Sequence, residues 1–393
     1  MISITEAFSI LENTPFPLKE VTVSLWEARN SVLAETVFSP INMPPFRQSN
    51  MDGYALCLHN VLEYSIVGEI KAGDFYSDKL QPGQAVKIYT GAAVPDSAQA
   101  VIQIEKVSAN GNLLQLQENV LPETNVRSLG SQITQNQIAL EKGTFLNAAA
   151  IGFLSGLGFT KVKVYQKPTV GIVITGNELV APGQPLPRGK VYESNAVMLQ
   201  SALYHSHFEN VTLYKVEDNF ENTKATLDKA IHENEMVIVS GGISVGDYDF
   251  VGKALENLNV KTLFYKVNQK PGKPLFAGKY NEKFIFALPG NPAASLTCLY
   301  IYVLTTLKKL SGLPVSYSSN YTLNLAHDYE ISNSRNQFLK ATIAGNEVTI
   351  LSHQDSSMLN SFALANALVY LPSGNYTKTK GDKVAVYLFQ QRD

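Results

Sequence analysis

The chain has 393 residues, which is long enough for two or three domains, or for four if some are small. Its 32 basic and 34 acidic residues leave a formal net charge of −2, which excludes a strongly basic chain that binds nucleic acid through its overall field and leaves open a local basic patch. The two cysteines, Cys57 and Cys298, exclude a disulfide framework and a cysteine-rich metal site, and they favour a reducing compartment.

The sequence shows no signal for secretion or membrane insertion. The first residues lack the basic and apolar regions of a signal peptide. The most apolar stretch, 293–307, is interrupted by serine and threonine and is shorter than the roughly 20 apolar residues that span a membrane. We therefore expect a soluble, cytoplasmic protein that binds neither nucleic acid nor membranes.

The first part of the chain combines two short helices with a β-rich region. Positions 4, 7, 8 and 11 are apolar and share one face of a helix at 4–13. Between about 40 and 140, β-forming runs at 64–70, 85–89, 101–107 and 113–116 are separated by Gly, Pro, Asn and Asp, which predicts a small, mostly β domain. A second helix, at 147–158, begins at the cap Asn147 and ends at Gly158.

The clearest fold signal lies between 169 and 312, after a boundary at Lys167-Pro168. Strands are expected at 169–175, 211–216, 236–240, 262–267 and 284–288, and helices at 194–208 (capped by Ser194 or Asn195), 222–233, 247–258 and 291–310. This alternation predicts a doubly wound α/β domain, with a parallel sheet, helices on both faces and ligands at the carboxyl ends of the strands. After 312–314 the pattern is β again, at 321–325, 338–343, 347–351, 367–371 and 383–389, which fits a small barrel or sandwich.

The loops that follow these strands carry the functional signal. Segments 175–179 (Thr-Gly-Asn-Glu-Leu) and 240–247 (Ser-Gly-Gly-Ile-Ser-Val-Gly-Asp) offer glycine N–H groups and hydroxyls to an anion. Segment 270–274 (Lys-Pro-Gly-Lys-Pro) fixes two ammonium groups that suit a phosphate or another oxyanion, and segment 288–292 (Leu-Pro-Gly-Asn-Pro) leads into the last helix. Each loop alone also fits simple turn chemistry. Together, at one edge of a sheet, they predict a site for a phosphorylated, nucleotide-like ligand, although neither G-x-G-x-x-G nor a P-loop pattern is present.

Carboxylates recur in the same loops, at Glu178, Asp218, Asp247 and Asp249. Such hard oxygen ligands suit Mg²⁺, which proteins usually hold with one or two carboxylates plus ligand phosphates. Asp247 fits equally well a favourable charge in the first turn of its helix. The histidines are not clustered, and the spacing predicts neither a histidine metal site nor a nucleophilic triad.

Two further loops stand out in the β-rich region. Segment 44–55 (Pro-Pro-Phe-Arg-Gln-Ser-Asn-Met-Asp-Gly-Tyr-Ala) combines a proline-constrained loop with a hydroxyl, a carboxylate and an aromatic ring before a strand. Segment 90–95 (Thr-Gly-Ala-Ala-Val-Pro) is a Gly/Pro loop at the end of another strand. The specific composition of 44–55 favours a binding segment over a plain connection.

These segments together resemble the molybdopterin molybdenumtransferase family, which is related to the E domain of gephyrin. The matching segments are 49–55, 90–95, 175–179 with Pro182-Gly183, 240–249, 270–274 and 288–292, and they occur in family order. The resemblance implies an L-shaped homodimer with four domains per chain. These are a helical domain I at 1–40 and 140–167, a β-rich domain II at 41–139, an α/β molybdopterin-binding domain III at 168–313 and a C-terminal, barrel-like β domain IV at 314–393.

The same resemblance implies the insertion of molybdate into the dithiolene of molybdopterin. The pterin arrives adenylylated, and AMP leaves with the help of Mg²⁺. The α/β domain is expected to bind the adenylylated pterin, and the loops of Asp52 and Thr90 to reach the same cleft from the partner subunit. A molybdopterin adenylyltransferase is an expected further partner.

The family's site residues can be carried over by position. The resemblance implies catalytic roles for Asp52, Glu178, Asp249, Lys270 and Lys273, with Glu178 and Asp249 as Mg²⁺ ligands and the two lysines on molybdate or phosphate. The implied substrate-binding residues are Thr90, Thr175, Gly176, Asp218, Ser240, Gly241, Gly242, Ser244, Gly246, Asp247, Pro289, Gly290, Asn291, Pro292, Arg335 and Ser356.

One segment departs from the family pattern. The family usually carries Arg-x-x-Gly-Glu-Asp in the β-rich region, whereas this chain has Arg127-Ser128-Leu129-Gly130-Ser131-Gln132 and lacks both acids. Asn177 also replaces an aspartate, which is a milder change. Three hypotheses stay open: a transferase in which other carboxylates compensate, a catalytically impaired carrier or scaffold that binds molybdopterin, and a related enzyme that acts on another nucleotide.

Overall fold

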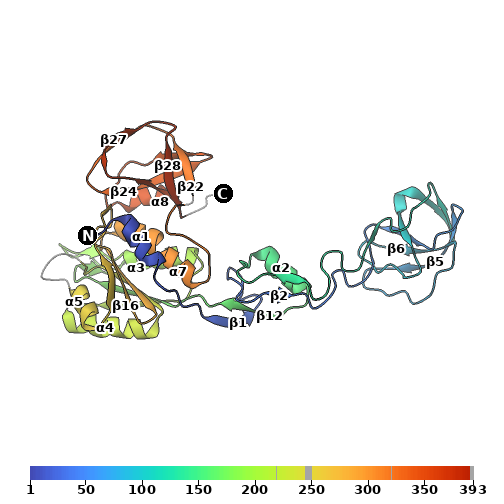
Figure 1. The fold of residues 1–393 in the computed structure, drawn as a ribbon, viewed down its shortest axis with the longest axis horizontal. Coiled ribbons are helices and arrows are strands. Elements are labelled where there is room, and N and C mark those ends of the chain that lie inside the picture. Colours follow the sequence, from blue (N-terminus) through green and yellow to red (C-terminus); the bar gives the residue numbers. More distant parts are fainter. Residues whose placement is uncertain (218, 244–249, 320, 390–393) are drawn as a thin grey trace. The chain divides into compact units, whose positions relative to one another are not determined.

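A computed structural model describes residues 1–217, 219–243, 250–319 and 321–389 of the chain (Figure 1). The chain divides into two compact units. The large unit comprises Met1–Val21, Asn30–Val32 and Tyr165–Asp393, and the small unit comprises Thr22–Arg29 and Leu33–Val164. The finer division into four domains stays a prediction.

A six-stranded sheet forms the centre of the large unit. Its strand order is β16 (Val211–Val216), β13 (Val170–Thr175), β17 (Met236–Ser240), β21 (Lys283–Leu288), β20 (Phe276–Tyr280) and β18 (Lys261–Tyr265). The first four strands are parallel, whereas β20 and β18 are antiparallel to their neighbours. The expectation of a fully parallel sheet was therefore wrong at this edge. No helix separates β18, β20 and β21: a two-residue turn joins β20 to β21, and a loop that contains strand β19 (Gln269–Lys270) joins β18 to β20, so neither pair has the helical crossover that parallel strands need.

Helices cover both faces of this sheet, as the doubly wound prediction requires. One face packs Ile172, Ile238 and Phe286 under the first helical layer, and the other packs Val173 and Ile285 under the second. The first layer contains α1 (Ile4–Glu12), α3 (Asn195–His205) and a continuous helical stretch made of α6 (Pro292–Cys298), a π-helical turn (Leu299–Val303) and α7 (Leu304–Leu310). The second layer contains α4 (Phe220–Glu233) and α5 (Phe250–Asn257), which lie away from α1 and α7 (Figure 1).

The helix starts follow local capping chemistry. Ser3 and Glu6 form a reciprocal capping box at α1, in which Ser3 Oγ accepts from the Glu6 N–H and Glu6 Oε2 accepts from the Ser3 N–H. The predicted helices at 4–13, 194–208 and 222–233 are confirmed within a few residues at each end. The helix predicted at 291–310 is also present, with the π-helical turn in its middle as the difference.

The C-terminal part of the large unit forms a closed barrel. Strands β24 (Asn336–Ala344), β25 (Glu347–Ile350), β22 (Tyr321–Leu325), β28 (Lys383–Leu388) and β26 (Ala367–Leu371) follow one another around it, and β26 pairs with β24 to close the ring. Helix α8 (Leu359–Leu364) and the hairpin of β23 (Tyr329–Asn333) and β27 (Gly374–Lys378) complete this part. Strand β19 (Gln269–Lys270), which precedes β20 in the chain, pairs with β24 and ties the barrel to the α/β layers.

The small unit is mostly β, as the sequence indicates. Its main sheet has the order β7 (Ala100–Gln103), β4 (Gly53–Leu56), β6 (Gln84–Ile88), β5 (Glu63–Ile70), β9 (Leu113–Leu116) and β8 (Val107–Asn110). Shorter pairs join β2 (Val37–Phe38) to β11 (Ile138–Leu140) and β3 (Gln48–Ser49) to β10 (Val126–Arg127). Helix α2 (Ala148–Gly156) begins as predicted at Asn147, whose Oδ1 accepts from the Ala150 N–H at 2.9 Å. The small unit also contains a 3₁₀ turn at Ile104–Lys106. The strands β1 (Glu20–Ser24) and β12 (Lys161–Tyr165) each include residues of both units.

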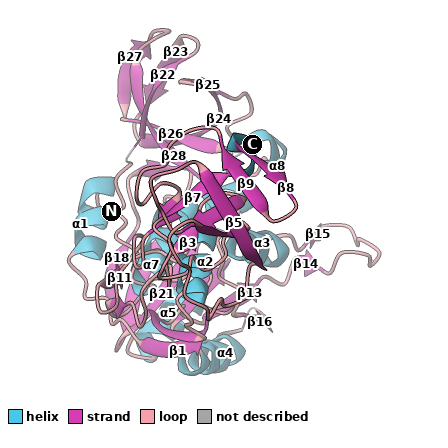
Figure 2. Ribbon diagram, turned by 90° about the vertical axis from the view of Figure 1, so that its right-hand side faces the viewer, coloured by secondary structure: helices cyan, strands magenta, loops and turns pink. Residues whose placement is uncertain are grey.

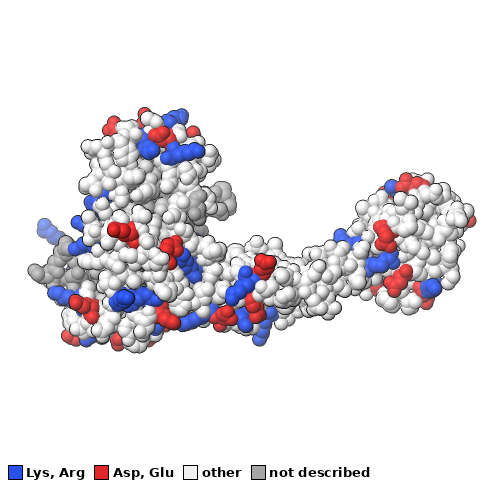
Figure 3. Space-filling view, viewed as in Figure 1, with Lys and Arg blue, Asp and Glu red and all other residues white. Residues whose placement is uncertain are grey.

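Charged side chains of both signs are interspersed on the face of each unit shown in Figure 3, in keeping with the small net charge. Within the described ranges, none of the helices has the length and apolar character needed to cross a membrane.

Candidate functional site

A cavity of about 610 Å³ opens at the carboxyl ends of three parallel strands of the large unit. Strands β13, β17 and β21 are direct neighbours, so the turns that follow them meet at one edge of the sheet, as predicted from the sequence. The predicted residues that line the cavity are Thr175, Gly176, Glu178, Gly241, Gly242, Pro289, Gly290, Asn291 and Pro292. Ser240, the last residue of β17, lies directly behind it and is 2 % exposed.

The turn after β17 has a backbone that only glycine accommodates well. Gly241 adopts a φ of +95° and Gly242 a φ of +63°. A Cβ atom on Gly241 would stand 2.7 Å from the carbonyl oxygen of Thr175, and one on Gly242 would stand 2.6 Å from the Val251 side chain. The glycines therefore let the turn lie against β13 and leave the space above it to the cavity.

Asn195, at the start of α3, links two of these turns. Its Nδ2 donates to Ser240 Oγ at 2.8 Å and to the carbonyl oxygen of Gly290 at 2.8 Å. Ser194 occupies the N-cap position of the helix without a side-chain capping bond, while Glu193 Oε1 accepts from the Ala196 N–H at 2.8 Å. From the sequence, Asn195 is expected only as a helix cap, and its contact with the site was not predicted.

Two polar atoms of the cavity wall are buried and have no hydrogen-bond partner among the described residues. They are Thr175 Oγ1 and Asn195 Oδ1. A buried polar atom is usually satisfied by protein, water or a ligand, because leaving it unpaired costs about 1–3 kcal/mol. Both atoms lie in lining residues of the same cavity, so they are suited to hold a polar ligand there.

Glu178 and Glu193 bring carboxylates to this part of the molecule. Glu178 is exposed and follows Gly176, whose added Cβ would lie 2.9 Å from Glu178 Oε1. The adjoining strands β14 (Leu179–Val180) and β15 (Val191–Tyr192) pair in parallel and extend with their long connecting loop away from the sheet (Figure 2). A second cavity of about 340 Å³ shares Gly176, Leu179 and Glu193 with the first and adds Lys215 and Glu217. The residues near the sheet edge thus offer acidic and basic groups to two neighbouring cavities that share part of their walls.

This donor set fits a magnesium ion that is held mainly by its ligand. Within the described segments, no three His, Cys, Asp or Glu side chains form a group that could hold a metal alone. Glu178 is exposed at the cavity and the Glu193 carboxylate is occupied at the start of α3. Among the described lining residues of the larger cavity, Glu178 therefore offers a carboxylate next to space for phosphates, which matches the way Mg²⁺ is usually bound.

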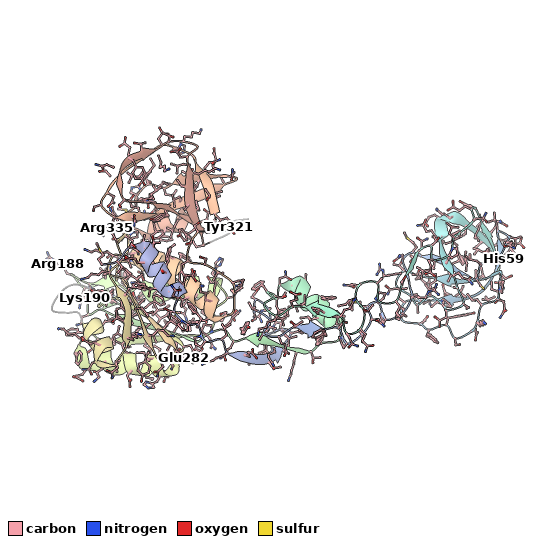
Figure 4. The ribbon with its side chains drawn as sticks, in the orientation of Figure 1. His59, Arg188, Lys190, Glu282, Tyr321 and Arg335 are labelled. Atoms are coloured by element: carbon pink, nitrogen blue, oxygen red, sulfur yellow. The ribbon has the colours of Figure 1, made fainter. Side chains whose placement is uncertain are left out.

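The lysine segment 270–274 lies between the α/β layers and the barrel. Pro274 lines the cavity, Lys270 is half-buried and Lys273 is exposed; neither lysine is among the described lining residues. The backbone at Lys270 is fixed by the pairing of β19 with β24. Arg335 Nη1 lies 3.5 Å from the carbonyl oxygen of Gln269, and Figure 4 shows Arg335 where the barrel adjoins the α/β layers. The predicted cations Lys270 and Arg335 are therefore brought to the same junction.

Ser356 contacts the cavity wall directly. Its Oγ accepts from Asn291 Nδ2 at 3.0 Å, and its carbonyl oxygen accepts from the Ala293 N–H at 3.1 Å. Asn291 occupies the N-cap position of α6, but its side chain donates a hydrogen bond to Ser356, in the loop between β25 and α8, and makes no capping bond. Through Ser356 the barrel reaches the start of α6.

Asp52 and Thr90 form a close pair in the small unit. Asp52 Oδ1 accepts from both the hydroxyl and the N–H of Thr90, each at 2.7 Å. The hydroxyl bond first, and then the backbone bond, lowers the pKa of the Asp52 carboxyl below its ordinary value. The carboxylate is thereby kept ionised and held in one orientation.

The segment that departs from the family pattern is tied down by its backbone. The N–H groups of Gly130 and Gln132 donate to the carbonyl oxygens of Pro44 and Met43, and Arg127 Nη1 donates to Gln48 Oε1 at 3.2 Å. The segment therefore contacts the start of the predicted binding loop 44–55 without offering a carboxylate.

Five predicted site residues lie outside the described part of the chain. They are Asp218, Ser244, Gly246, Asp247 and Asp249. Their sequence-based roles stay predictions.

Comparison with known proteins assigns the whole chain to one family. Family models match residues 2–158 as "MoeA N-terminal region (domain I and II)", 171–309 as "Probable molybdopterin binding domain" and 322–389 as "MoeA C-terminal region (domain IV)". A molybdopterin molybdenumtransferase of Haemophilus influenzae is 32 % identical over 400 residues, which cover 99 % of each chain. The chain belongs to this family.

Other relatives agree with that membership. The molybdopterin molybdenumtransferase of Staphylococcus epidermidis is 31 % identical over 98 % of this chain and 95 % of its own. The crystal structure of the molybdopterin biosynthesis protein MoeA of Pyrococcus horikoshii superposes with a TM-score of 0.81 at 28 % identity, and the alignment covers 100 % of both chains. Members of the molybdopterin molybdenumtransferase family are transferases of molybdenum-cofactor biosynthesis, and this chain has the fold of that family over its full length.

Proposed function

We propose that this chain inserts molybdate into adenylylated molybdopterin and releases AMP. The observation that carries the proposal is the 610 Å³ cavity at the carboxyl ends of β13, β17 and β21, in a chain of this family. Glycine turns keep its floor open, and its wall includes Thr175 Oγ1 and Asn195 Oδ1, two buried polar atoms without a hydrogen-bond partner in the described part of the chain. A cavity of this size and polarity suits a ligand with a heterocycle and phosphates.

We assign the charged residues around the cavity complementary roles in this reaction. Lys270, Lys273 and Arg335 would balance the negative charge of molybdate and of the departing AMP. Glu178, together with Asp249 outside the described residues, would hold Mg²⁺ against the substrate phosphates. When bound, Mg²⁺ would neutralise phosphate charge and so favour release of the nucleotide. The turns at 240–246 and 289–292, with Thr175 and Gly176, would hold the adenylylated pterin.

We further propose that the enzyme works as a homodimer. In this arrangement the Asp52–Thr90 pair of one subunit completes the cleft of the other. The bond pattern around Asp52 supports a functional part for this loop, because an exposed carboxylate held by two donors has a fixed orientation in which it can contact a further group. A molybdopterin adenylyltransferase is the class of enzyme that would supply the substrate.

The direct test mixes the purified protein with adenylylated molybdopterin and Mg²⁺, with and without molybdate, and follows AMP release beside pterin binding. AMP release that molybdate stimulates is the expected result. Tight pterin binding without release, under conditions in which the Haemophilus influenzae relative turns over, would overturn the transferase proposal.

The absence of the two family acids at Ser131 and Gln132 favours one second candidate, a molybdopterin carrier or scaffold. Under this alternative the chain binds the adenylylated pterin and does not turn it over. Ser131→Glu combined with Gln132→Asp separates the two cases. A gain of AMP release in the double variant indicates a site disabled by the missing acids, whereas an unchanged rate indicates that other groups compensate.

A further inference from the structure

Lys340, in the middle of strand β24, is a buried cation on the outer face of the C-terminal barrel, because its neighbours Leu339 and Ala341 belong to the barrel core and successive side chains of a strand point to opposite faces. Its residue is 3 % exposed, so its ammonium group depends on protein partners in place of water. Nζ donates to the carbonyl oxygens of His353 at 2.7 Å, Asp355 at 3.3 Å and Met358 at 3.1 Å. An ammonium group has three N–H donors, and here each has its own acceptor.

All three acceptors belong to one loop, residues 352–358, between β25 and α8. The loop therefore surrounds the Lys340 ammonium group with three backbone carbonyl oxygens. His353 adopts a φ of 61°, which side-chain-bearing residues rarely take, and its carbonyl oxygen accepts from both Lys340 Nζ and Ser361 Oγ. Burial lowers the pKa of Lys340 while the Asp355 carboxylate raises it, and the three donated bonds require the protonated form.

A second set of bonds holds the same loop against the backbone of Lys340. Gln354 Oε1 accepts from the Lys340 N–H at 2.9 Å, and Gln354 Nε2 donates to the carbonyl oxygens of Lys340 and Leu351 at 2.9 and 2.7 Å. Side chain and backbone of one residue thus fix the loop on two sides. These bonds connect Lys340 to four residues of the loop and so help to fix its conformation.

This loop carries Ser356, which bonds to the cavity wall. Ser356 Oγ accepts from Asn291 Nδ2, and its carbonyl oxygen accepts from the Ala293 N–H. The first residues of β24, Asn336 and Gln337, pair with the strand that carries Lys270. Strand β24 therefore contacts both the strand that carries Lys270 and the loop that carries Ser356.

We propose that Lys340 is a positioning residue for the site: it folds loop 352–358 and thereby holds Ser356 against Asn291 at the wall of the cavity. The proposal rests on the proposed function only in that the cavity is taken as the substrate site. Lys340 has no direct contact with the cavity among its described bonds, so it acts through Ser356.

The test uses Lys340→Met, which keeps a flexible, unbranched side chain one heavy atom shorter and removes all three donors. In the full-length protein without ligand, we expect faster hydrogen exchange in the amides of 353–358 and at Ala293, with unchanged exchange in the pairing of β22 with β28. The dissociation constant for AMP and the Michaelis constant for adenylylated pterin should each rise about tenfold, because small misplacements of positioning groups have effects of this size or larger. Lys340→Arg, which keeps charge and donors, should recover part of both effects.

A double-mutant comparison separates positioning from a general loss of stability. If Lys340 acts through Ser356, then Ser356→Ala weakens AMP binding in the wild type and adds little in the Lys340→Met background. The proposal would be overturned if the effects of Ser356→Ala and Lys340→Met on AMP binding were fully additive. It would also be overturned if folded Lys340→Met showed the same hydrogen exchange at 353–358 as the wild type. Should that variant not fold, Ser361→Ala removes bonds to the same carbonyl oxygens, leaves Lys340 in place, and must shift exchange in the same direction.

The two proposals fail in different ways. A wild-type protein that binds no AMP and releases none from the adenylylated pterin contradicts the proposed function. The exchange experiment on the unliganded chain still decides the part assigned to Lys340, since it needs no substrate.

Discussion

Asn195 Nδ2 lies 2.8 Å from Ser240 Oγ, and this contact joins the start of α3 to the end of β17. The same nitrogen lies 2.8 Å from the carbonyl oxygen of Gly290, after β21. One amide group therefore holds together two of the turns that form the floor of the cavity. Because the two N–H groups of this amide each have their own acceptor, the site depends on the chemical identity of this side chain more than on its size.

Replacing Asn195 by Asp tests that dependence. The carboxylate keeps the shape but places an oxygen against the Gly290 carbonyl, so we expect the free energy of unfolding to fall by about 1–3 kcal/mol. AMP binding should fall as well, since the repelled turns line the cavity. Urea unfolding and calorimetry measure the two effects. Asn222→Ala, at an exposed position of α4, is the control and should change stability by less than about 0.5 kcal/mol. Equal stability of Asn195→Asp and the wild type would contradict the bridging role.

Gly241 and Gly290 allow a matched comparison of two glycines in the same wall. Gly241→Ala forces a Cβ to within 2.7 Å of the Thr175 carbonyl oxygen at a φ of +95°, so we expect a loss of more than about 2 kcal/mol in stability. Gly290→Ala meets its nearest atom at 3.7 Å, so its folded state should be nearly as stable as the wild type. Thermal unfolding of both variants measures the difference. A similar melting temperature for the two would show that the turn after β17 adapts easily.

The Asp52–Thr90 pair predicts a specific pH dependence. Thr90→Ala removes the hydroxyl bond, which is the larger cause of the lowered Asp52 pKa, and leaves the backbone bond. The pKa of Asp52 should therefore rise toward its ordinary value, while Thr90→Ser should leave it low. A carboxylate with a lowered pKa stabilises the folded state above its ordinary pKa, and this contribution disappears as the pH falls through the lowered value. Carbon-13 NMR titration of the Asp52 carboxyl measures the shift, and the same pKa in Thr90→Ala and the wild type would rule out this cause.

Much of the large unit could be predicted because its strands are short buried apolar runs that end in glycine turns. Strands β16 and β17 have the predicted bounds, and the turns at 175–176, 241–242 and 289–290 meet at one edge, as the parallel order requires. Strand β20 was missed, because Gly278 and Lys279 weaken the β pattern there and the pairing that stabilises it comes from β21 and β18.

The site could be predicted where a loop carries the chemistry in its own sequence. The role of Asn195 could not be predicted, because an asparagine at the start of a helix is expected to cap it. Only the fold shows that its amide group donates to Ser240 and Gly290. Lys340 is a similar case. A lysine within an alternating strand is expected at the surface, and only the loop at 353–358 supplies the carbonyl groups that allow its burial.

Lys270 is expected to affect the response to molybdate more than the stability of the protein. Its backbone is held by β24, so Lys270→Ala removes the charge and keeps the loop. The molybdate concentration for half-maximal AMP release should rise on the order of tenfold or more, the size of a lost hydrogen bond to a charged group. Lys261→Ala, at an exposed position on the edge strand β18, is the control and should leave this concentration unchanged. An unchanged molybdate dependence in Lys270→Ala would count against the assignment.

The lysine loop is held from inside by Gln269, and this support can be tested through Tyr302. The Tyr302 hydroxyl donates to Gln269 Oε1 at 2.5 Å, and Gln269 Nε2 donates to the carbonyl oxygen of Gly272 at 3.3 Å. Gln269 is 0 % exposed, so Tyr302→Phe leaves a buried amide oxygen without this donor, and we expect a loss of about 1–3 kcal/mol in stability.

Tyr300→Phe is the matched control, since Tyr300 lies in the same π-helical turn and its hydroxyl makes no hydrogen bond to the described residues. It should change stability by less than about 0.5 kcal/mol. Hydrogen exchange of the amides at 270–275 should become faster in Tyr302→Phe and stay unchanged in Tyr300→Phe. The contrary outcome is an equal loss of stability in both variants with unchanged exchange at 270–275. It would show that the Tyr302–Gln269 bond does not support the lysine loop, and that the pairing of β19 with β24 holds the loop without it.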